Sequence, residues 1–423
     1  MTEEMKSSEV EWLGRIPAEW SIDRVKFHYN NSKQIVGTKA DNYGRLALTL
    51  NGVVKRPKDD ADGLQPDDFS GYQILESGDL VFKLIDLQNV STSRVGLAHD
   101  KGIVSPAYIR LVSKNGNSSR FGEYYFLSMW QREIFNQLGD AGVRSNLSSS
   151  DLLNLPYVDV PFSEQEMVAD FLDEKCAEID KLSEDIQKQI DILEEYKRSV
   201  ITRAVTKGID ANAGMKKSDM DWVGLIPNNW RVEKIKYHLS RDEKRNPGDE
   251  QVLSVYREYG VIPKDSRDDN YNVTSEDTSK YKYAKPNQLV INKMKAWQGS
   301  MGVSEYKGVV SPAYFIYSIF DAQIRPRYIH YLLRSCYRDE FRRISGGIRE
   351  GQWDLPATGF ENTNICIPPL EEQDRILDFI ESIVPKIDES VLAKQEQLNT
   401  LFGYKKSIIY EYVTGKKRVK GAK

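Results

Sequence analysis

A chain of 423 residues and 48.5 kDa is too long for one ordinary domain, so its length predicts two or three domains. With 40% hydrophobic and 29% charged residues, the composition excludes disordered, collagen-like and disulfide-scaffold chains. The formal net charge of −4 gives no basic field over the whole protein, so any nucleic-acid site must rest on local residues. The acidic start lacks a signal-peptide pattern and no stretch reaches the roughly 20 apolar residues of a membrane span, from which we expect a cytoplasmic protein.

The first 160 residues contain short apolar runs separated by turn residues. The runs 45–50, 78–85 and 102–111 have the length of strands, and turn residues such as Asn51-Gly52 lie between them. Apolar residues at helical spacing predict one helix over 124–138. This part is therefore expected to be a mixed α/β domain.

A helical run with neither glycine nor proline covers residues 163–207. Ser163 and Glu166 predict a capping box at its start, and Gly208 is a natural stop. At 1.5 Å per residue the run spans about 65 Å, which is longer than a small domain is wide. A heptad pattern predicts two seams, of which one comprises Ile179, Ile186, Leu193 and Val200 and the other Leu182, Gln189, Tyr196 and Arg203.

The chain then repeats itself. The opening MKSSEVEWLGRIPAEWSIDRVKFH from Met5 returns from Met215 as MKKSDMDWVGLIPNNWRVEKIKYH. GIVSPAYI returns as GVVSPAYF, PFSEQEMVADFL as PLEEQDRILDFI, and EEYKRSVITRAVTKG as FGYKKSIIYEYVTG. The offset stays between 205 and 210 residues. One module is therefore used twice, and we refer to residues 1–208 as the first copy and to the rest as the second copy.

The second copy has strand-like runs at 251–256, 287–294 and 308–319 and a helix pattern over 326–344. In its long helical run Pro385 stands where the first copy has Ala177, which predicts a kink or a break and restart. The run has an apolar stripe made of Ile387, Val391, Leu398, Leu401, Ile408 and Tyr412. Each long helix needs a partner along its length. We expect the two to pack antiparallel with pseudo-twofold symmetry, the alternative being that each packs on its own domain.

No catalytic pattern is present in the sequence. It contains no GxxxxGK[ST] phosphate loop, GxGxxG turn, GxSxG elbow or HExxH pair. The three cysteines lie far apart and form no CxxC pair, which argues against a zinc site. His28 and His238 correspond between the copies, and a framework role is the favoured interpretation for both. We therefore expect no catalytic residue, metal site or cofactor site in this chain.

Local basic residues could contact DNA. The segment 325–349 holds seven arginines against two acids, although a solvated helix face explains the middle arginines equally well. Gly347 and Arg349 differ from these, because glycine permits close approach to a duplex and arginine is the commonest reader of guanine. The first copy places Arg144, Ser145 and Asn146 at the same point.

Two further segments carry candidate DNA contacts. After the strand at 289–292 come Lys293, Lys295, Trp297 and Gln298, and the first copy has Lys83 and Asn89 in this segment. Different polar residues on a shared scaffold are expected if the two copies recognise different DNA sequences. A loop without functional constraint would vary in the same way. The weakest candidates are Lys55 and Arg56, matched by Tyr256 and Arg257.

The repeated blocks resemble the specificity subunit of type I restriction-modification systems. The blocks are W-x-G-x-I-P-x-x-W, VSPAY and PxxEQ…YKxSxI…VT, each present twice in the same order, and the resemblance covers essentially the whole chain. It implies an α+β protein in which two mixed α/β target-recognition domains alternate with two long antiparallel coiled-coil helices. The expected boundaries are 1–160 and 209–368 for the domains, 161–208 and 369–415 for the helical regions, and 416–423 for a basic tail.

The resemblance also implies a function. The subunit itself would be non-catalytic, each domain would read one half of a bipartite asymmetric target in double-stranded DNA, and the helices would fix the spacer. Two methyltransferase subunits using S-adenosylmethionine would dock on it and flip an adenine in each half-site, joined by two restriction/translocase subunits that consume ATP and Mg²⁺. A DNA-free scaffold and another duplicated DNA-binding regulator remain alternatives, which the salt dependence of duplex binding separates.

Overall fold

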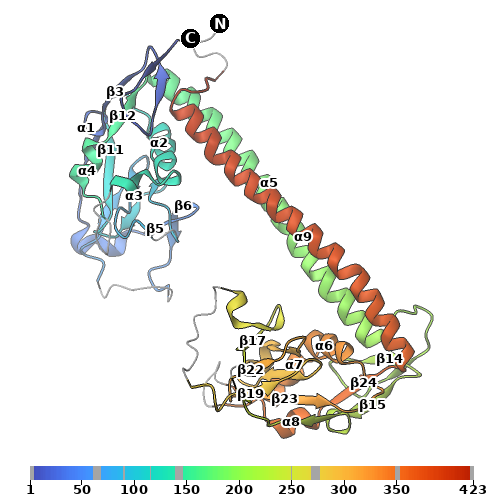
Figure 1. Cartoon of the computed structure of the whole chain (residues 1–423). Helices are drawn as coiled ribbons and strands as arrows, with labels where there is room; N and C mark the ends of the chain where they lie inside the picture. The colour runs from blue at the N-terminus through green and yellow to red at the C-terminus, as the bar shows by residue number, and fades with distance from the viewer. Residues whose placement is uncertain are drawn as a thin grey trace. The chain divides into compact units, whose positions relative to one another are not determined.

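The computed structural model describes residues 4–60, 68–88, 91–114, 116–138, 146–248, 250–267, 277–347 and 353–419. The chain divides into two compact units, one of Met1–Gln187 with Glu396–Lys423 and one of Lys188–Gln395. Each unit holds one mixed α/β domain, half of the long helix α5 (Phe162–Lys207) and half of the long helix α9 (Leu370–Val413) (Figure 1). The two units are described separately below.

Short sheets build the domain of the first unit. Two four-stranded sheets have the orders β6-β5-β10-β7 and β4-β11-β8-β9, and two-stranded sheets pair β1 with β2 and β12 with β3. The strands are β1 (Met5–Ser7), β2 (Arg15–Pro17), β3 (Ser21–Arg24), β4 (Tyr29–Asn31), β5 (Arg45–Thr49), β6 (Gly52–Arg56), β7 (Gln73–Leu75), β8 (Leu80–Phe82), β9 (Val95–Leu97), β10 (Gly102–Val104), β11 (Ile109–Ser113) and β12 (Pro156–Asp159).

The domain of the second unit has matching strands in the same order along the chain. Its four-stranded sheet β16-β23-β20-β21 matches β4-β11-β8-β9, and the pairs β13-β14, β15-β24, β17-β18 and β19-β22 match the remaining pairs. Its β17-β18 and β19-β22 pairs are linked by the isolated parallel bridge Val252↔Val309, whereas the matching pairs of the first unit form one four-stranded sheet. The strands are β13 (Met215–Lys217), β14 (Leu225–Pro227), β15 (Arg231–Lys234), β16 (Leu239–Arg241), β17 (Leu253–Tyr256), β18 (Gly260–Pro263), β19 (Lys282–Ala284), β20 (Leu289–Asn292), β21 (Met301–Val303), β22 (Gly308–Val310), β23 (Tyr314–Ile319) and β24 (Asn364–Ile367). The predicted strand runs and the duplication are confirmed.

The helix predicted within each domain is interrupted. In the second unit α6 (Pro326–Ser335) stops before α7 (Arg338–Ile344), and in the first unit α2 (Ser119–Gln131) stops before α3 (Ile134–Leu138). A single helix over 124–138 or 326–344 was therefore the wrong expectation, because the break lets both pieces bury their apolar faces in the core, Phe135 and Phe341 included. The remaining short helices are α1 (Val25–His28), α4 (Ser149–Asn154), α8 (Ala357–Glu361) and the 3₁₀ turns η1 (Gly37–Asn42), η2 (Ile235–Tyr237), η3 (Lys264–Ser266) and η4 (Ala296–Gln298).

The two long helices run antiparallel within each unit. In the first unit the Phe171 and Tyr412 rings lie 4.4 Å apart, and Lys405 pairs with Asp180 at 2.5 Å. In the second unit Lys197 pairs with Asp388 at 2.5 Å. Residue numbers rise along one helix as they fall along the other, so the expected antiparallel partnership is confirmed.

One of the two seams predicted on α5 is displaced by one residue. Ile179 and Ile186 are buried as expected, but Leu182 and Tyr196 are about half exposed. The second buried row instead includes Ile190 and Ala204, four residues after members of the first row. Positions three and four apart share a helix face, and here the i+4 row faces the partner helix.

Both long helices begin at a proline carbonyl. The Pro161 carbonyl accepts the N–H groups of Glu164 and Gln165, and the Pro369 carbonyl accepts the corresponding pair in α9. The predicted capping box of Ser163 and Glu166 is wrong, because the helix already includes Ser163 and the Glu166 carboxylate pairs with Arg120 at 2.8 Å.

The equivalent glutamines Gln165 and Gln373 join the helices to the domains. The Gln165 side chain accepts the N–H of Ser118 at 2.8 Å and donates to the Val160 carbonyl at 2.8 Å. Gln373, with 0% of its surface exposed, accepts the N–H of Arg325 at 2.8 Å. It also donates to two carbonyls, those of Gln323 and Pro368. We call these two arrangements the glutamine sockets.

Helix α9 continues through Pro385. The break and restart expected there is wrong, since one helix runs from Leu370 to Val413. Proline removes a main-chain hydrogen bond and costs about 3 kcal/mol in a helix interior. Burial of Ile380, Ile387 and Val391 on either side offsets this cost.

We therefore expect Pro385→Ala to raise the free energy of unfolding by about 1–3 kcal/mol, since alanine restores the missing donor. Urea unfolding followed by circular dichroism at 222 nm measures this change. Lys386→Ala, at the exposed neighbouring position, serves as the control and should stay within about 0.5 kcal/mol of the parent. A Pro385→Ala variant no more stable than the parent would contradict our explanation.

Candidate DNA-contact surface

The structure brings together two segments of the second copy that were predicted separately. The N–H of Leu355 donates to the Lys293 carbonyl at 3.0 Å, and Gly346 and Asp354 exchange two main-chain hydrogen bonds of 3.2 and 2.9 Å. The Lys293 ammonium donates to the Asp354 carboxylate at 2.7 Å. The loop after β20 and the turn that includes Gly347 therefore form one surface.

Aromatic side chains lie on this surface. The Trp297 and Trp353 rings are 5.5 Å apart, and the Arg342 guanidinium lies 5.6 Å from the Trp353 ring centre. Trp297 and Gln298 are half-buried, whereas Lys295 is exposed. Trp353 was not predicted from the sequence. Its position shortly after the glycine turn could have indicated it. Half-exposed indoles beside cations can stack on bases or on the sugar edge of a duplex.

Tyr256 and Arg257 lie at the β17–β18 hairpin, which Arg334 of α6 holds in place. The Arg334 guanidinium donates to the Arg257 and Glu258 carbonyls at 2.7 and 2.8 Å and to the Met301 carbonyl at 2.7 Å. Burial lowers the pKa of Arg334 to about 10. Arg334 is therefore a structural residue of the hairpin.

Three other arginines of the 325–349 segment have carboxylate partners, while 39–69% of each arginine side chain stays exposed. Arg325 pairs with Asp374 at 2.7 Å and Arg327 with Glu305 at 2.8 Å. Arg343 pairs with Glu340 at 2.7 Å. Charge counted along the sequence overstated the basicity, because acids from distant segments neutralise it.

The first copy has an equivalent loop and turn. The Leu147 N–H donates to the Leu84 carbonyl at 2.9 Å, and Asn146 accepts the N–H of Asp86 at 2.9 Å. Lys83 donates to the Thr92 hydroxyl at 3.2 Å, and burial lowers its pKa. The candidates Asn89, Arg144, Ser145 and Arg349 lie outside the residues that the structure describes.

The weakest candidates of the first copy lie together on β6. Lys55 pairs with Asp100 at 2.8 Å while 70% of its side chain stays exposed. Arg56 pairs with Asp60 at 2.5 Å. Both cations therefore have internal partners, and the structure does not bring them to the loop that carries Lys83.

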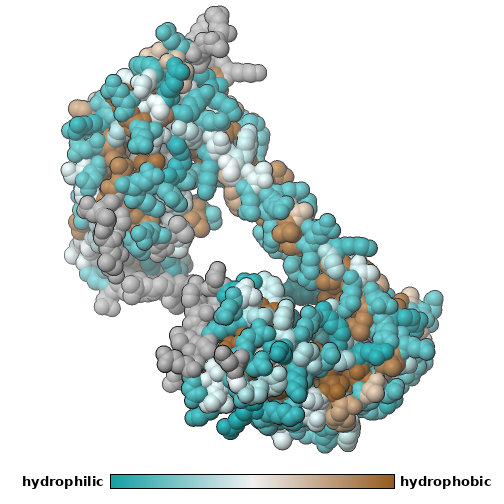
Figure 2. All heavy atoms as spheres, viewed as in Figure 1, coloured by the Kyte–Doolittle hydropathy of each residue, from teal (hydrophilic) through white to brown (hydrophobic). Residues whose placement is uncertain are grey.

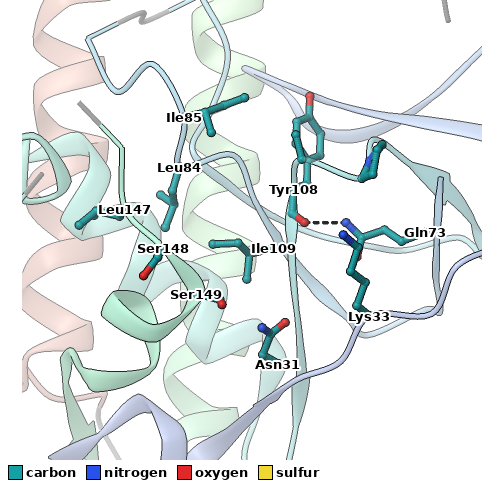
Figure 3. A pocket seen from close by; sticks show the side chains of 12 residues that line it. Asn31, Lys33, Gln73, Leu84, Ile85, Tyr108, Ile109, Leu147, Ser148 and Ser149 are labelled. Carbon is teal, nitrogen blue, oxygen red and sulfur yellow. Dashed lines mark hydrogen bonds between the residues drawn. The ribbon is translucent and has the colours of Figure 1, made fainter. Parts of the chain in front are cut away.

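A pocket of about 260 Å³ opens beside the loop of the first copy (Figure 3). Gln73 forms part of its wall, and its side chain donates to the Tyr108 carbonyl at 2.6 Å. The lining combines apolar and uncharged polar groups with a single lysine: Asn31, Lys33, Gln73, Leu84, Ile85, Pro106, Ala107, Tyr108, Ile109, Leu147, Ser148 and Ser149. The pocket could not be predicted from the sequence, because its walls come from five separate segments.

Glu123 and His330 play the same structural part in the two copies. Glu123 accepts the N–H of Leu97 in β9 at 2.9 Å, and His330 accepts the N–H of Val303 in β21 at 3.2 Å. Burial raises the pKa of Glu123, whereas burial, with Arg334 and Arg327 nearby, lowers that of His330 to about 3.

We expect acid to destabilise the second unit through His330. The unfolded chain takes up a proton on this residue below about pH 6.5, but the folded chain does so only near pH 3. The free energy of unfolding should therefore fall by up to about 1.4 kcal/mol per pH unit as the pH is lowered through this window. Urea unfolding at several pH values measures it. His330→Gln, which keeps an acceptor but cannot titrate, should have the shallower slope, and equal slopes would contradict the assignment.

Among the described residues no group of three or more His, Cys, Asp or Glu side chains could hold a metal ion. Within the same ranges, no helix combines the length and apolar character that crossing a membrane requires.

Comparison with known proteins shows which proteins the chain is similar to. A family model described as the type I restriction modification DNA specificity domain matches residues 236–400. The chain is 22% identical to the putative type I restriction enzyme MjaX specificity subunit of Methanocaldococcus jannaschii, over 96% of both chains. The chain is thus similar to specificity subunits of type I restriction-modification systems. The MjaVIII specificity subunit of the same organism is 26% identical, over 76% of this chain and 75% of that relative.

The fold agrees with this family. A chain from a solved structure described as underlying complex assembly and conformational transition of the type I R-M system matches with a TM-score of 0.63 and 14% identity. The match covers 95% of this chain and 99% of that chain.

Proposed function

We propose that this chain is the DNA sequence-specificity subunit of a type I restriction-modification enzyme, with residues 1–160 reading one half of an asymmetric target and residues 209–368 the other. The supporting observation is that two domains of identical strand order carry different side chains at matched loop positions. Lys293 of the second copy occupies the place of Leu84 in the first. A shared scaffold with different contact residues suits two different half-sites.

The reading residues are drawn from the loop and turn of each copy. In the second copy they are Lys293, Lys295, Trp297, Gln298, Gly347 and Arg349, with Tyr256 and Arg257 on the neighbouring hairpin. In the first copy they are Lys83, Asn89, Arg144, Ser145 and Asn146, with Lys55 and Arg56 on β6. The last two have carboxylate partners, so DNA would have to compete for them.

The long helices are proposed to fix the spacer between the half-sites and to dock the methyltransferase subunits, in the helical regions 161–208 and 369–415. Large hydrophobic side chains remain exposed on both helices: Leu182, Ile192, Tyr196, Leu392, Phe402 and Tyr404. Figure 2 shows hydrophobic side chains on the surface of the helical part. Tyr196 and Tyr404 are equivalent positions of the two copies, exposed by 53% and 52%. Equivalent exposed tyrosines suit two identical partners, one on each unit.

The reactions would belong to the partners. S-adenosylmethionine would be bound by the methyltransferase subunits, and ATP with Mg²⁺ by two restriction/translocase subunits. The tail, 416–423, is basic in sequence, and Lys416 in it donates to the Leu13 carbonyl at 2.6 Å.

Mapping methylated adenines in a host with and without the gene tests the proposal. A bipartite motif that appears only with the gene supports it. Binding of the full chain to that duplex, measured at several salt concentrations, separates the alternatives: a scaffold binds no duplex, whereas domains that contact phosphates bind with a steep salt dependence. A regulator of another kind would bind DNA without altering methylation.

A further inference from the structure

Three cations converge on one aromatic ring in the second copy. Arg241, Lys282 and Lys293 lie 4.7, 5.8 and 6.0 Å from the ring centre of Phe315. They come from β16, from β19 and from the loop after β20, so three separate elements hold them. We call Arg241, Lys282 and Lys293 the cation trio.

The trio has fewer carboxylate partners than charges. Glu243 pairs with both Arg241 and Lys282, and Asp354 pairs with Lys293. Both carboxylates remain about half exposed, whereas 12% of the Lys282 side chain is exposed. Among the described residues, three positive groups around a buried ring are thus paired with two half-exposed carboxylates, which leaves a net positive site that an external anion can complete.

The strand registers show what stands at this place in the first copy. Arg241 and Asn31 occupy the same position in their sheets, as do Lys282 and Gln73, and Phe315 and Ile109. Lys293 corresponds to Leu84 through the matching hydrogen bonds from Leu355 and Leu147. Asn31, Gln73, Leu84 and Ile109 all line the pocket of Figure 3. One position of the duplicated fold is therefore a pocket in the first copy, where these four residues are uncharged, and a cation cluster in the second.

Comparing Lys282 with its equivalent Gln73 shows which part of the lysine's role is structural and which depends on its charge. Lys282 donates to the Tyr314 carbonyl at 2.9 Å, and Gln73 donates to the equivalent Tyr108 carbonyl at 2.6 Å. Glutamine thus fulfils the structural part of this position without a charge. The positive charge of Lys282 is an addition that the fold does not require.

We propose that the cation trio binds a phosphate of the DNA backbone in the half-site read by the second copy. This rests on the proposed function and deepens it. Lys293 joins the trio to the loop and turn that carry Trp297 and Gly347, so a phosphate held here would fix the position of that reading surface on the duplex. The first copy has no counterpart to the trio at this position, and its own phosphate contacts must lie elsewhere.

The test is a transplant of the first copy's residues into the second. The variant Arg241→Asn, Lys282→Gln, Lys293→Leu and the single variant Lys282→Gln are compared with the parent as full chains. The association constant for the mapped target duplex is measured by fluorescence anisotropy over a range of KCl concentrations. Loss of one phosphate contact should reduce the slope of log K against log salt by about 0.9. In Lys282→Gln, which leaves the reading residue Lys293 in place, the ratio of target to non-target affinity should stay unchanged, because a phosphate contact carries no sequence information.

Lys405→Gln is the matched control, because Lys405 is a cation on α9 that pairs with Asp180. It should leave the salt slope unchanged. A slope unaltered in the triple variant, or lowered equally by Lys405→Gln, would overturn the phosphate site while leaving the proposed function intact. A parent that binds no duplex would instead refute the proposed function itself. Unfolding curves of Lys282→Gln confirm that the fold survives, as the glutamine of the first copy predicts.

Discussion

Exchanging residues 20–155 for the same segment of a relative should change one half of the methylated target completely and leave the other half intact. The two ends of this segment are neighbours, since β3 pairs with β12 and the Val25 N–H donates to the Leu155 carbonyl at 3.0 Å. The exchange therefore replaces most of the domain, from β3 to α4, and leaves β1, β2, β12 and both long helices unchanged. Each wrong base pair costs about 1–3 kcal/mol, so several altered positions abolish recognition of the old half-site.

Sequencing of methylated adenines in cells carrying the hybrid chain measures this outcome. The mirror exchange of residues 230–363 has the same geometry, because the Ile235 N–H donates to the Thr363 carbonyl at 3.0 Å, and it should change the other half. A hybrid with both halves altered, or with neither altered, would refute the assignment of one half-site to each domain.

Replacing Gln373 by leucine should destabilise the second unit by about 3–5 kcal/mol. The change leaves the Arg325 N–H and two carbonyls without the partners that the buried amide supplies. Each unpaired buried polar group costs about 1–3 kcal/mol. Gln165→Leu should have the corresponding effect on the first unit.

Hydrogen–deuterium exchange resolved by peptide locates the damage. Gln373→Leu should increase exchange at the starts of α6 and α9 and spare the first unit, and Gln165→Leu should do the reverse. Arg375→Leu, at an exposed position two residues further along α9, is the control. Equal protection in Gln373→Leu and the control would show that the socket contributes little.

The duplication, the strand runs and the long helices could be predicted because each depends on local periodicity or on direct repetition. The exact residues of the second seam of α5 could not be predicted. Leu182 and Ser183 lie three and four residues after Ile179, and both positions share its helix face. The partners of Arg325 and Arg334 could not be predicted either. Their acceptors, Asp374 and the hairpin carbonyls, are distant in sequence and become neighbours only in the fold.

The candidate surface was predicted in part. Lys293 and Gly347 could be proposed because Lys293 follows a strand and Gly347 belongs to a glycine pair. Arg241 and Lys282 were not predicted, because each is an isolated cation within a strand. The fold brings both of them to the Phe315 ring. Aligning the two copies strand by strand would have found both, at positions where Asn31 and Gln73 are uncharged.

The glutamine sockets bear on how such chains diversify. Gln165 and Gln373 accept main-chain N–H groups, from a serine in one copy and an arginine in the other, and donate only to main-chain carbonyls. These contacts do not depend on the side chains of the domain, whereas the neighbouring ion pairs Arg120–Glu166 and Arg325–Asp374 do. An exchanged domain that keeps these arginines is therefore expected to fit the same helices without further mutations at the joint.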